Sequence, residues 1–257
     1  MKRLTGLSCC VALLLSWQLP AFALNVESLE PNERAQLEAV MQALGAGIEP
    51  KKADGTANLL TWEALYAPLD ADGRAFLDAF RALKAESLGA TSHHYGDTPP
   101  EDLVGVELQY VLKNGAQTPV DAQYLPRKVL TAYRAMMVAM KRDLGTSLRV
   151  ESGYRAPAYQ LYLFLFYLPK HGYSIRETNR FVALPGYSEH GAPDRQAIDF
   201  INERGINGED HPEEFEALPE YAWLQAHAAQ FGFVLSYPRD NPSHTSFEPW
   251  HWHYEKH

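Results

Sequence analysis

Two clusters of polar residues in the C-terminal half have the types and spacing of a catalytic zinc site. The first contains His190 and Asp199, and the second is the run Glu-Pro-Trp-His at 248–251. Two imidazoles and one carboxylate supply three protein ligands and leave a fourth tetrahedral position for water, which is typical of catalytic rather than structural zinc. The sequence therefore predicts metal-assisted hydrolysis.

Glu248 is the predicted general base of this chemistry. It precedes His251 by three residues, so its carboxylate can reach a water on a metal bound by that histidine. Zinc lowers the pKa of such a water from about 15.7 to about 7, and a nearby carboxylate can take its proton. The alternating run 250–253 predicts a strand with His251 and His253 on one side and the tryptophans on the other.

Two positions have competing interpretations. His253 is either a spare ligand or catalytic imidazole, or a residue that supports the metal ligands from behind, and we favour the supporting role. Asp194 competes with Asp199 as the carboxylate ligand. We favour Asp199, because it falls on a predicted strand whereas Asp194 falls in a loop.

Hydrophobic periodicity predicts helices and short strands without a regular βαβ rhythm, which favours an α+β fold. Gly45 and Gly47 are expected to end the first helix, and Gly145 the helix that opens with Pro126. The predicted helices cover 32–44, 70–88, 126–144, 159–168 and 219–231, and the predicted strands cover 103–112, 148–152, 197–201, 233–236 and 250–253.

Residues 1–23 are predicted to be a secretory signal peptide. Lys2 and Arg3 give a positive start, an apolar stretch follows, and Ala-Phe-Ala at 21–23 offers a cleavage site. We expect an exported protein, periplasmic or extracellular, with no stable membrane insertion after cleavage; an uncleaved anchor is the alternative. Both cysteines, Cys9 and Cys10, lie in this segment, so the mature chain has no thiol ligand, nucleophile or disulfide.

The formal net charge of −9 argues against a nucleic-acid partner, because binding to phosphates relies on Lys and Arg. Two peptidase classes are excluded by their signatures. The chain contains no Ser-x-x-Lys of the serine D,D-peptidases and no His-Glu-x-x-His of the thermolysin type.

Three motifs in order resemble the zinc D-alanyl-D-alanine carboxypeptidases, kin of the vancomycin-resistance carboxypeptidases and dipeptidases within the wider lysostaphin and hedgehog group. They are Ser-Gly-Tyr-Arg at 152–155 followed by Tyr-Gln at 159–160, Ser188-x-His190 with a later Ala197-x-Asp199, and Glu248-x-Trp250-His251. The resemblance covers roughly residues 120 to 257.

The resemblance implies a role for each motif residue. His190, Asp199 and His251 would bind one Zn²⁺ per chain, and Glu248 would act as general base and then acid. Arg155 would stabilise the oxyanion of the tetrahedral intermediate. Ser188 and Gln160 would contact substrate, and His253 would support the ligands.

The chain departs from the family pattern between His190 and Asp199. Arg195 stands where the family usually has a glycine, and the gap between the two ligands is two residues longer. A surface loop can absorb such an insertion without moving the ligands. We expect this longer loop to affect substrate preference.

The sequence therefore predicts an exported zinc peptidase, most readily a D,D-carboxypeptidase acting on peptidoglycan stem peptides. The alternatives are a D-Ala-D-Ala dipeptidase or a lysin-like endopeptidase, and a non-catalytic zinc-dependent cell-wall binding module, against which Glu248 and Arg155 together argue. The expected fold is a small antiparallel sheet with flanking helices that carries the zinc site. We expect a signal peptide (1–23), a mainly helical region of unknown role (24–115) and the peptidase domain (116–257).

Overall fold

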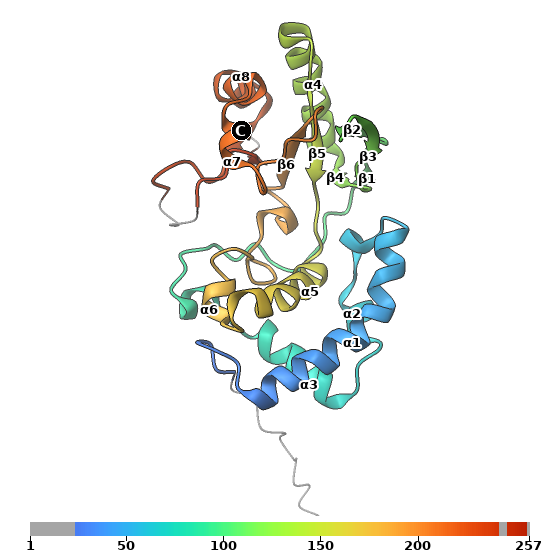
Figure 1. Ribbon diagram of the computed structural model, residues 1–257, viewed down its shortest axis with the longest axis vertical. Coiled ribbons are helices and arrows are strands. Elements are labelled where there is room, and N and C mark those ends of the chain that lie inside the picture. Colours follow the sequence, from blue (N-terminus) through green and yellow to red (C-terminus); the bar gives the residue numbers. More distant parts are fainter. Residues whose placement is uncertain (1–23, 242–245, 256–257) are drawn as a thin grey trace, which may run out of the picture.

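The computed structural model describes residues 24–241 and 246–255 and has the predicted α+β architecture. The predicted signal peptide lies outside these residues. Figure 1 shows α1, α2, α3, α5 and α6 at one end of the molecule and α4, α7, α8 and the largest sheet at the other. Within the described residues, no helix is long and apolar enough to cross a membrane.

The N-terminal region is helical, as expected. Its first helix is longer than predicted, because it runs through Gly45 and Gly47 instead of ending there. Val40, Leu44 and Ile48 continue one buried row across the glycines, and this packing offsets the roughly 0.5–1 kcal/mol that each glycine costs in a helix. The elements are α1 (Pro31–Ala53), η1 (Ala57–Leu59), α2 (Trp62–Tyr66), α3 (Ala71–Arg81) and η2 (Ala85–Leu88).

A connecting segment follows with two short antiparallel pairings. The strand predicted over 103–112 is split in two, because Gln109 turns its side chain toward Val150 and bonds both the amide and the carbonyl of that residue. Strand β1 pairs with β4, and β2 pairs with β3. The bounds are β1 (Leu103–Gly105), β2 (Tyr110–Lys113), β3 (Ala116–Pro119) and β4 (Tyr124–Pro126).

The largest sheet is antiparallel, with the strand order β5-β6-β8-β7. Helix α4 packs on it through a row of apolar residues and ends at Gly145, whose φ of 77° closes the helix as predicted. The predicted strands and the other helices appear within a few residues of their expected positions. The elements are α4 (Arg127–Leu144), β5 (Leu148–Ser152), β6 (Ala197–Asn202), α7 (Pro212–Glu216), α8 (Pro219–His227), η5 (Ala228–Phe231), β7 (Phe233–Leu235) and β8 (His251–Tyr254).

The hydrophobic side chains form two cores. One core lies between the sheet and α4. The other joins the N-terminal helices to α5, where Phe80 packs edge-on against Phe164. This second core therefore includes part of the expected peptidase domain, namely α5 (Pro157–Tyr167), η3 (Leu168–His171) and α6 (Ile175–Thr178); η4 (Glu189–Gly191) then leads back to the sheet.

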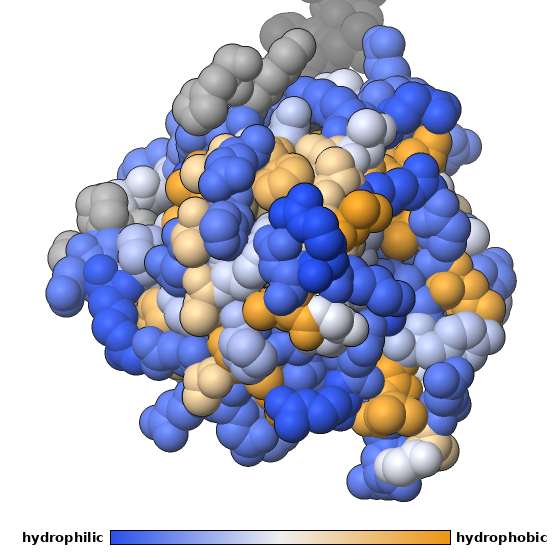
Figure 2. All heavy atoms as spheres, turned by 90° about the horizontal axis from the view of Figure 1, so that it is seen from above, coloured by the Kyte–Doolittle hydropathy of each residue, from blue (hydrophilic) through white to orange (hydrophobic). Residues whose placement is uncertain are grey.

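The outer face seen in Figure 2 is mostly hydrophilic, and its hydrophobic residues appear as separate small groups. That distribution is ordinary for a protein surface, where apolar side chains remain scattered among polar ones.

Candidate metal centre and active site

Strand pairing brings two of the predicted ligands side by side. In the register of β6 and β8, Asp199 is the partner of His251, and Ala197 is the partner of His253. Because side chains alternate along a strand, His251 and His253 share a face, while Trp252 points into the core. His190 comes from the short helix η4, where Ser188 receives a hydrogen bond from the backbone N–H of His190.

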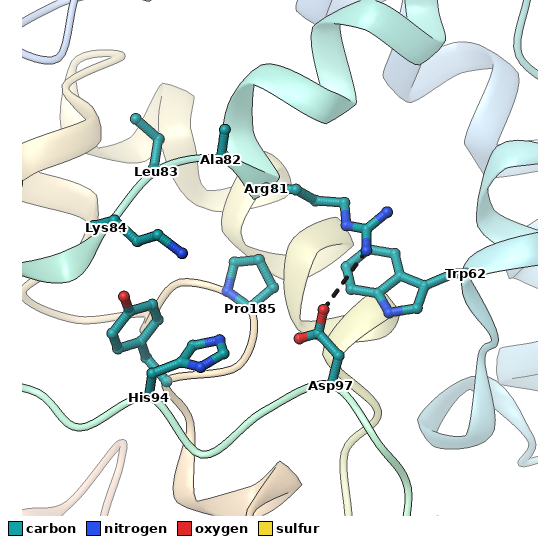
Figure 3. A pocket seen from close by; sticks show the side chains of 9 residues that line it. Trp62, Arg81, Ala82, Leu83, Lys84, His94, Asp97 and Pro185 are labelled. Atoms are coloured by element: carbon teal, nitrogen blue, oxygen red, sulfur yellow. Dashed lines mark ion pairs between the residues drawn. The ribbon is translucent and has the colours of Figure 1, made fainter.

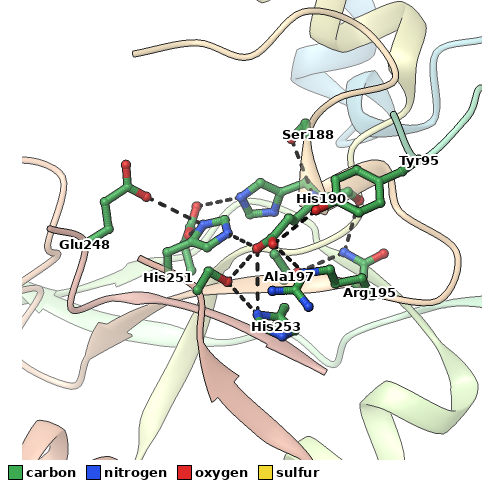
Figure 4. Close-up of polar contacts among 12 residues, drawn as sticks. Tyr95, Ser188, His190, Arg195, Ala197, Glu248, His251 and His253 are labelled. Atoms are coloured by element: carbon green, nitrogen blue, oxygen red, sulfur yellow. Dashed lines mark hydrogen bonds and ion pairs between the residues drawn. The ribbon is translucent and has the colours of Figure 1, made fainter. Parts of the chain in front are cut away.

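His190, Asp199 and His251 form a group whose ligand atoms all lie within 4.8 Å of one another. His190 Nε2 is 3.0 Å from one carboxylate oxygen of Asp199, and His251 Nδ1 is 2.8 Å from the other. The two imidazole planes are nearly perpendicular, at 87°. Figure 4 shows both rings converging on the same point.

The remaining ring nitrogens are held from behind, which fixes the orientation of both imidazoles. His190 Nδ1 lies 2.8 Å from the carbonyl of Gly153, and His251 Nε2 lies 3.0 Å from Glu189. This leaves Nε2 of His190 and Nδ1 of His251 facing Asp199. Two such nitrogens and one carboxylate oxygen suit a zinc ion, so these residues fit the metal that the sequence predicts.

The electrostatics of the three residues follow from their burial. Burial lowers the pKa of His190, which favours the neutral ring that a metal requires. Burial would also lower the pKa of His251, but Asp199 and Glu189 raise it to about 10. Burial would raise the pKa of Asp199, yet the two histidines hold it well below its usual range.

Glu248 lies beside the cluster without belonging to it. Its carboxylate is 3.9 Å from His251 Nδ1, and its side chain is 23% exposed. Its backbone N–H donates to the carbonyl of Tyr237, and its own carbonyl accepts from the N–H of His251. Burial raises the pKa of Glu248 to about 7, so this carboxylate can both take up and release a proton near neutral pH.

Arg155 lies in the loop between β5 and α5 and points its guanidinium at two neighbours. It donates to Gln160 Oε1 at 2.9 Å and to Ser152 Oγ at 3.1 Å. Gln160 is only 2% exposed, and its amide nitrogen donates to the carbonyl of Ala183. The structure therefore places Gln160 behind Arg155, where it orients the guanidinium, rather than at an open surface as expected for a substrate contact.

Glu189 was not predicted, although its buried carboxylate contacts several residues of the site. Besides His251, its carboxylate receives hydrogen bonds from Arg195, at 2.6 Å, and from Ser236. Burial would raise its pKa, but the hydrogen bond with His251 holds the pKa of Glu189 well below its usual range. The one sequence signal was its position between Ser188 and His190.

His253 lies behind the cluster, and its supporting role stays a prediction. It is 1% exposed, contacts Ser236 at 2.7 Å and Glu255 at 2.9 Å, and lies 3.8 Å from Glu189. Arg195, the departure from the family pattern, bridges Glu189 and Glu255. The altered loop thus contributes a cation to the layer of residues behind His251.

The competing carboxylate Asp194 is fully exposed and 4.0 Å from Lys128, so it takes no part in the cluster. In the described part of the chain, the metal-competent group is the one built on Asp199. A pocket of about 250 Å³ lies elsewhere, lined by His94 among others. There Arg81 stacks on Trp62 and pairs with Asp97, as Figure 3 shows.

The fold and this site define an α+β protein with a largely buried His-Asp-His group beside Glu248, whose pKa burial raises. The model of the D-alanyl-D-alanine carboxypeptidase family, VanY, matches residues 122–257, more than half of the chain. The protein therefore belongs to this family of D-alanyl-D-alanine carboxypeptidases.

Two relatives share 30% identity with the chain. One is YodJ of Bacillus subtilis (strain 168), by its name a candidate carboxypeptidase, matched over 161 residues, 62% of this chain and 55% of YodJ. The other is the bifunctional D-Ala-D-Ala dipeptidase and D-Ala-D-Ala carboxypeptidase VanXYC of Enterococcus gallinarum, matched over 137 residues, 51% of this chain and 67% of VanXYC. The chain thus spans little more than half the length of YodJ.

Solved structures with a similar arrangement include the LdcB LD-carboxypeptidase, with 27% identity and a TM-score of 0.48 over 62% of this chain and 70% of LdcB. VanYB in complex with D-alanine-D-alanine has 24% identity and a TM-score of 0.44 over 64% of this chain and 84% of VanYB. A mutant VanY D,D-pentapeptidase in complex with Zn(II) has 25% identity and a TM-score of 0.42 over 59% of this chain and 79% of that protein.

Proposed function

We propose that the protein is an exported zinc D,D-carboxypeptidase that removes the terminal D-alanine from peptidoglycan stem peptides. The observation that supports this most directly is the orientation of the two imidazoles. Gly153 and Glu189 hold one nitrogen of each ring, so that the other nitrogens and Asp199 converge on one position. Membership of the carboxypeptidase family supports the choice of substrate.

His190, Asp199 and His251 would hold one zinc ion, which when bound supplies a Lewis acid for the scissile carbonyl and lowers the pKa of water. Glu248 accepts the proton of the attacking water. It then returns that proton to the leaving amine, which its pKa near 7 allows. Arg155, fixed by Gln160 and Ser152, faces the developing negative charge of the substrate oxygen.

Export rests on the sequence of residues 1–23, and we propose cleavage after Ala23. Recovery of the mature protein from the cell envelope with an N-terminus near Leu24 is the expected result. An intact Met1 on a membrane-bound form would replace this proposal with an uncleaved anchor.

A D-Ala-D-Ala dipeptidase activity is the second candidate, favoured by the similarity to the bifunctional VanXYC. Mass spectrometry separates the two candidates. The zinc-loaded protein is incubated with purified stem pentapeptides and, separately, with free D-Ala-D-Ala. Loss of one alanine from the pentapeptide supports the carboxypeptidase, and hydrolysis of the free dipeptide supports the dipeptidase. Binding to cell wall without either reaction would leave the binding module as the function.

A further inference from the structure

The pocket next to Arg155 has a wall that comes from outside the residues matched by the family model. This pocket has a volume of about 390 Å³. Ser152, Arg155 and Tyr159 line it from the β5–α5 side, and Lys52 and Asn58 line it from the N-terminal region. The family match begins only at residue 122.

The N-terminal wall is held in place by three contacts. The carbonyl of Asn58 accepts a hydrogen bond of 2.9 Å from the N–H of Ala156, the residue that follows Arg155. The side-chain amide of Asn58 donates to Gln123 at 3.4 Å. Gly55, at a φ of 76°, approaches Ala122 so closely that a side chain at Gly55 would overlap it. The segment 55–58 is therefore docked against the peptidase residues.

Lys52 is oriented at the edge of this pocket. Its ammonium group lies 2.9 Å from the exposed Glu49 and 3.4 Å from the hydroxyl of Tyr162, and it sits 5.3 Å from the centre of the Tyr162 ring. An ammonium group has three donors, so these two contacts leave one for a ligand. Because Glu49 is 66% exposed, its pairing with Lys52 is weak and can be exchanged for a better one.

The charges of the lining favour an anion. Lys52 and Arg155 are positive, and the one acid in the lining is Asp121, which is exposed. Gln123 is 5% exposed and its Oε1 accepts from Gly153, while among the described residues its amide nitrogen has no hydrogen-bond partner. A carboxylate on a peptide offers both the charge for Lys52 and the acceptors for such a donor.

We propose that the N-terminal region completes the substrate site, and that Lys52 binds a carboxylate of the stem peptide other than the one released with the terminal residue. This inference rests on the proposed peptidase function. It makes Lys52 a specificity-determining residue that distinguishes acidic from amidated stems, and it gives the N-terminal region a role in substrate binding.

The test uses two stem pentapeptides that differ in one group, a free carboxylate upstream of D-Ala-D-Ala in one and the corresponding amide in the other. Lys52→Met removes the charge and keeps the chain length. We expect KM for the free-carboxylate peptide to rise about tenfold, with kcat unchanged and the amidated peptide unaffected. Lys52→Arg should restore most of the affinity. Lys51→Met, the same change one residue away and outside the pocket lining, is the matched control.

Equal effects of Lys52→Met on both peptides, or none on either, would overturn the proposal while leaving the peptidase function intact. Calorimetry measures binding of both peptides to the zinc-loaded wild type and to Lys52→Met. It separates failure of the carboxylate site from failure of the peptidase function. If the wild type binds the acidic peptide more tightly through Lys52 but hydrolyses neither, the peptidase function fails and the carboxylate site stands. If the wild type neither binds nor hydrolyses either peptide, both proposals fail.

Discussion

The two cores of the molecule use burial for different purposes. The core between the sheet and α4 is apolar, but beside it burial also encloses charged and polar side chains, and each imidazole of the metal cluster is held by a partner behind it. In the N-terminal core, burial encloses aromatic and aliphatic side chains, such as Phe80 and Leu44, that have no polar partner to find. The first arrangement holds a few atoms in fixed geometry, whereas the second provides stability and a wall for the substrate pocket.

The largest expected effect is the loss of the metal from the sheet region. His251→Ala removes one of three ligands, and three protein ligands are the usual minimum of a catalytic zinc site. We expect about one zinc per wild-type chain and none in the variant, by elemental analysis, with no detectable hydrolysis. His190→Ala should behave in the same way. Full zinc retention in both variants would refute the assignment.

The next largest effect is expected in the N-terminal core. Phe80→Ala opens a cavity where Phe80 meets Phe164 of α5, and such substitutions cost about 3–5 kcal/mol. Urea unfolding should show that loss for the protein as a whole, because α5 belongs to this core. The folded fraction should still bind zinc. A separate unfolding transition for the N-terminal helices, with the sheet unaffected, would show that the two cores are independent.

Within the site, binding and chemistry can be separated. Glu248→Gln keeps size and shape but cannot accept a proton, so zinc content should persist while kcat falls about 10²-fold or more. Single-turnover hydrolysis of a stem pentapeptide measures the effect. A variant with the wild-type rate would exclude Glu248 as the base, and His253 would become the next candidate.

A smaller effect tests Glu189, the residue behind His251. Glu189→Gln replaces a carboxylate that receives hydrogen bonds from both His251 and Arg195. Loss of such an outer partner usually weakens metal affinity about 10- to 100-fold, which competition with a zinc chelator can measure. Glu38→Gln is the control, because it makes the same change at an exposed position of α1 that has no contact with the cluster. Unchanged affinity in Glu189→Gln would mean that strand pairing alone orients the imidazole.

The sequence could predict those features of the site that depend on local patterns, but not those that depend on distant contacts. Ligand types and motif spacing predicted His190, Asp199 and His251, and alternation predicted that His251 and His253 share a face. Both are local patterns. Glu189 could not be recognised, because its role depends on a contact with a residue 62 positions later.

Tertiary packing explains the structural differences from the predictions. Helix α1 continues through Gly45 because its apolar row meets a core that the local sequence does not reveal. The strand expected over 103–112 is interrupted because Gln109 bonds to Val150, 41 residues away. The N-terminal core includes α5 for the same reason, since α5 packs against helices from the N-terminal region.

The smallest expected effect concerns Glu151, a carboxylate of β5 near the metal cluster. Burial, together with the charge of Asp199, raises its pKa from an ordinary 4.5 to about 7. The folded protein therefore keeps a proton on Glu151 between pH 4.5 and 7 that the unfolded chain releases, so stability falls as pH rises through this window.

Glu151→Gln is neutral throughout and should remove that loss. Urea unfolding of metal-free protein measures the effect. We expect the free energy of unfolding of the variant, compared with that of wild type, to be about 1 kcal/mol more favourable at pH 8 than at pH 5. The exposed Glu38→Gln on α1 is the control for removing one negative charge. An equal gain in both variants would mean that the effect comes from net charge. The pH dependence of stability would then not distinguish the polar region around the metal cluster from the apolar helical region.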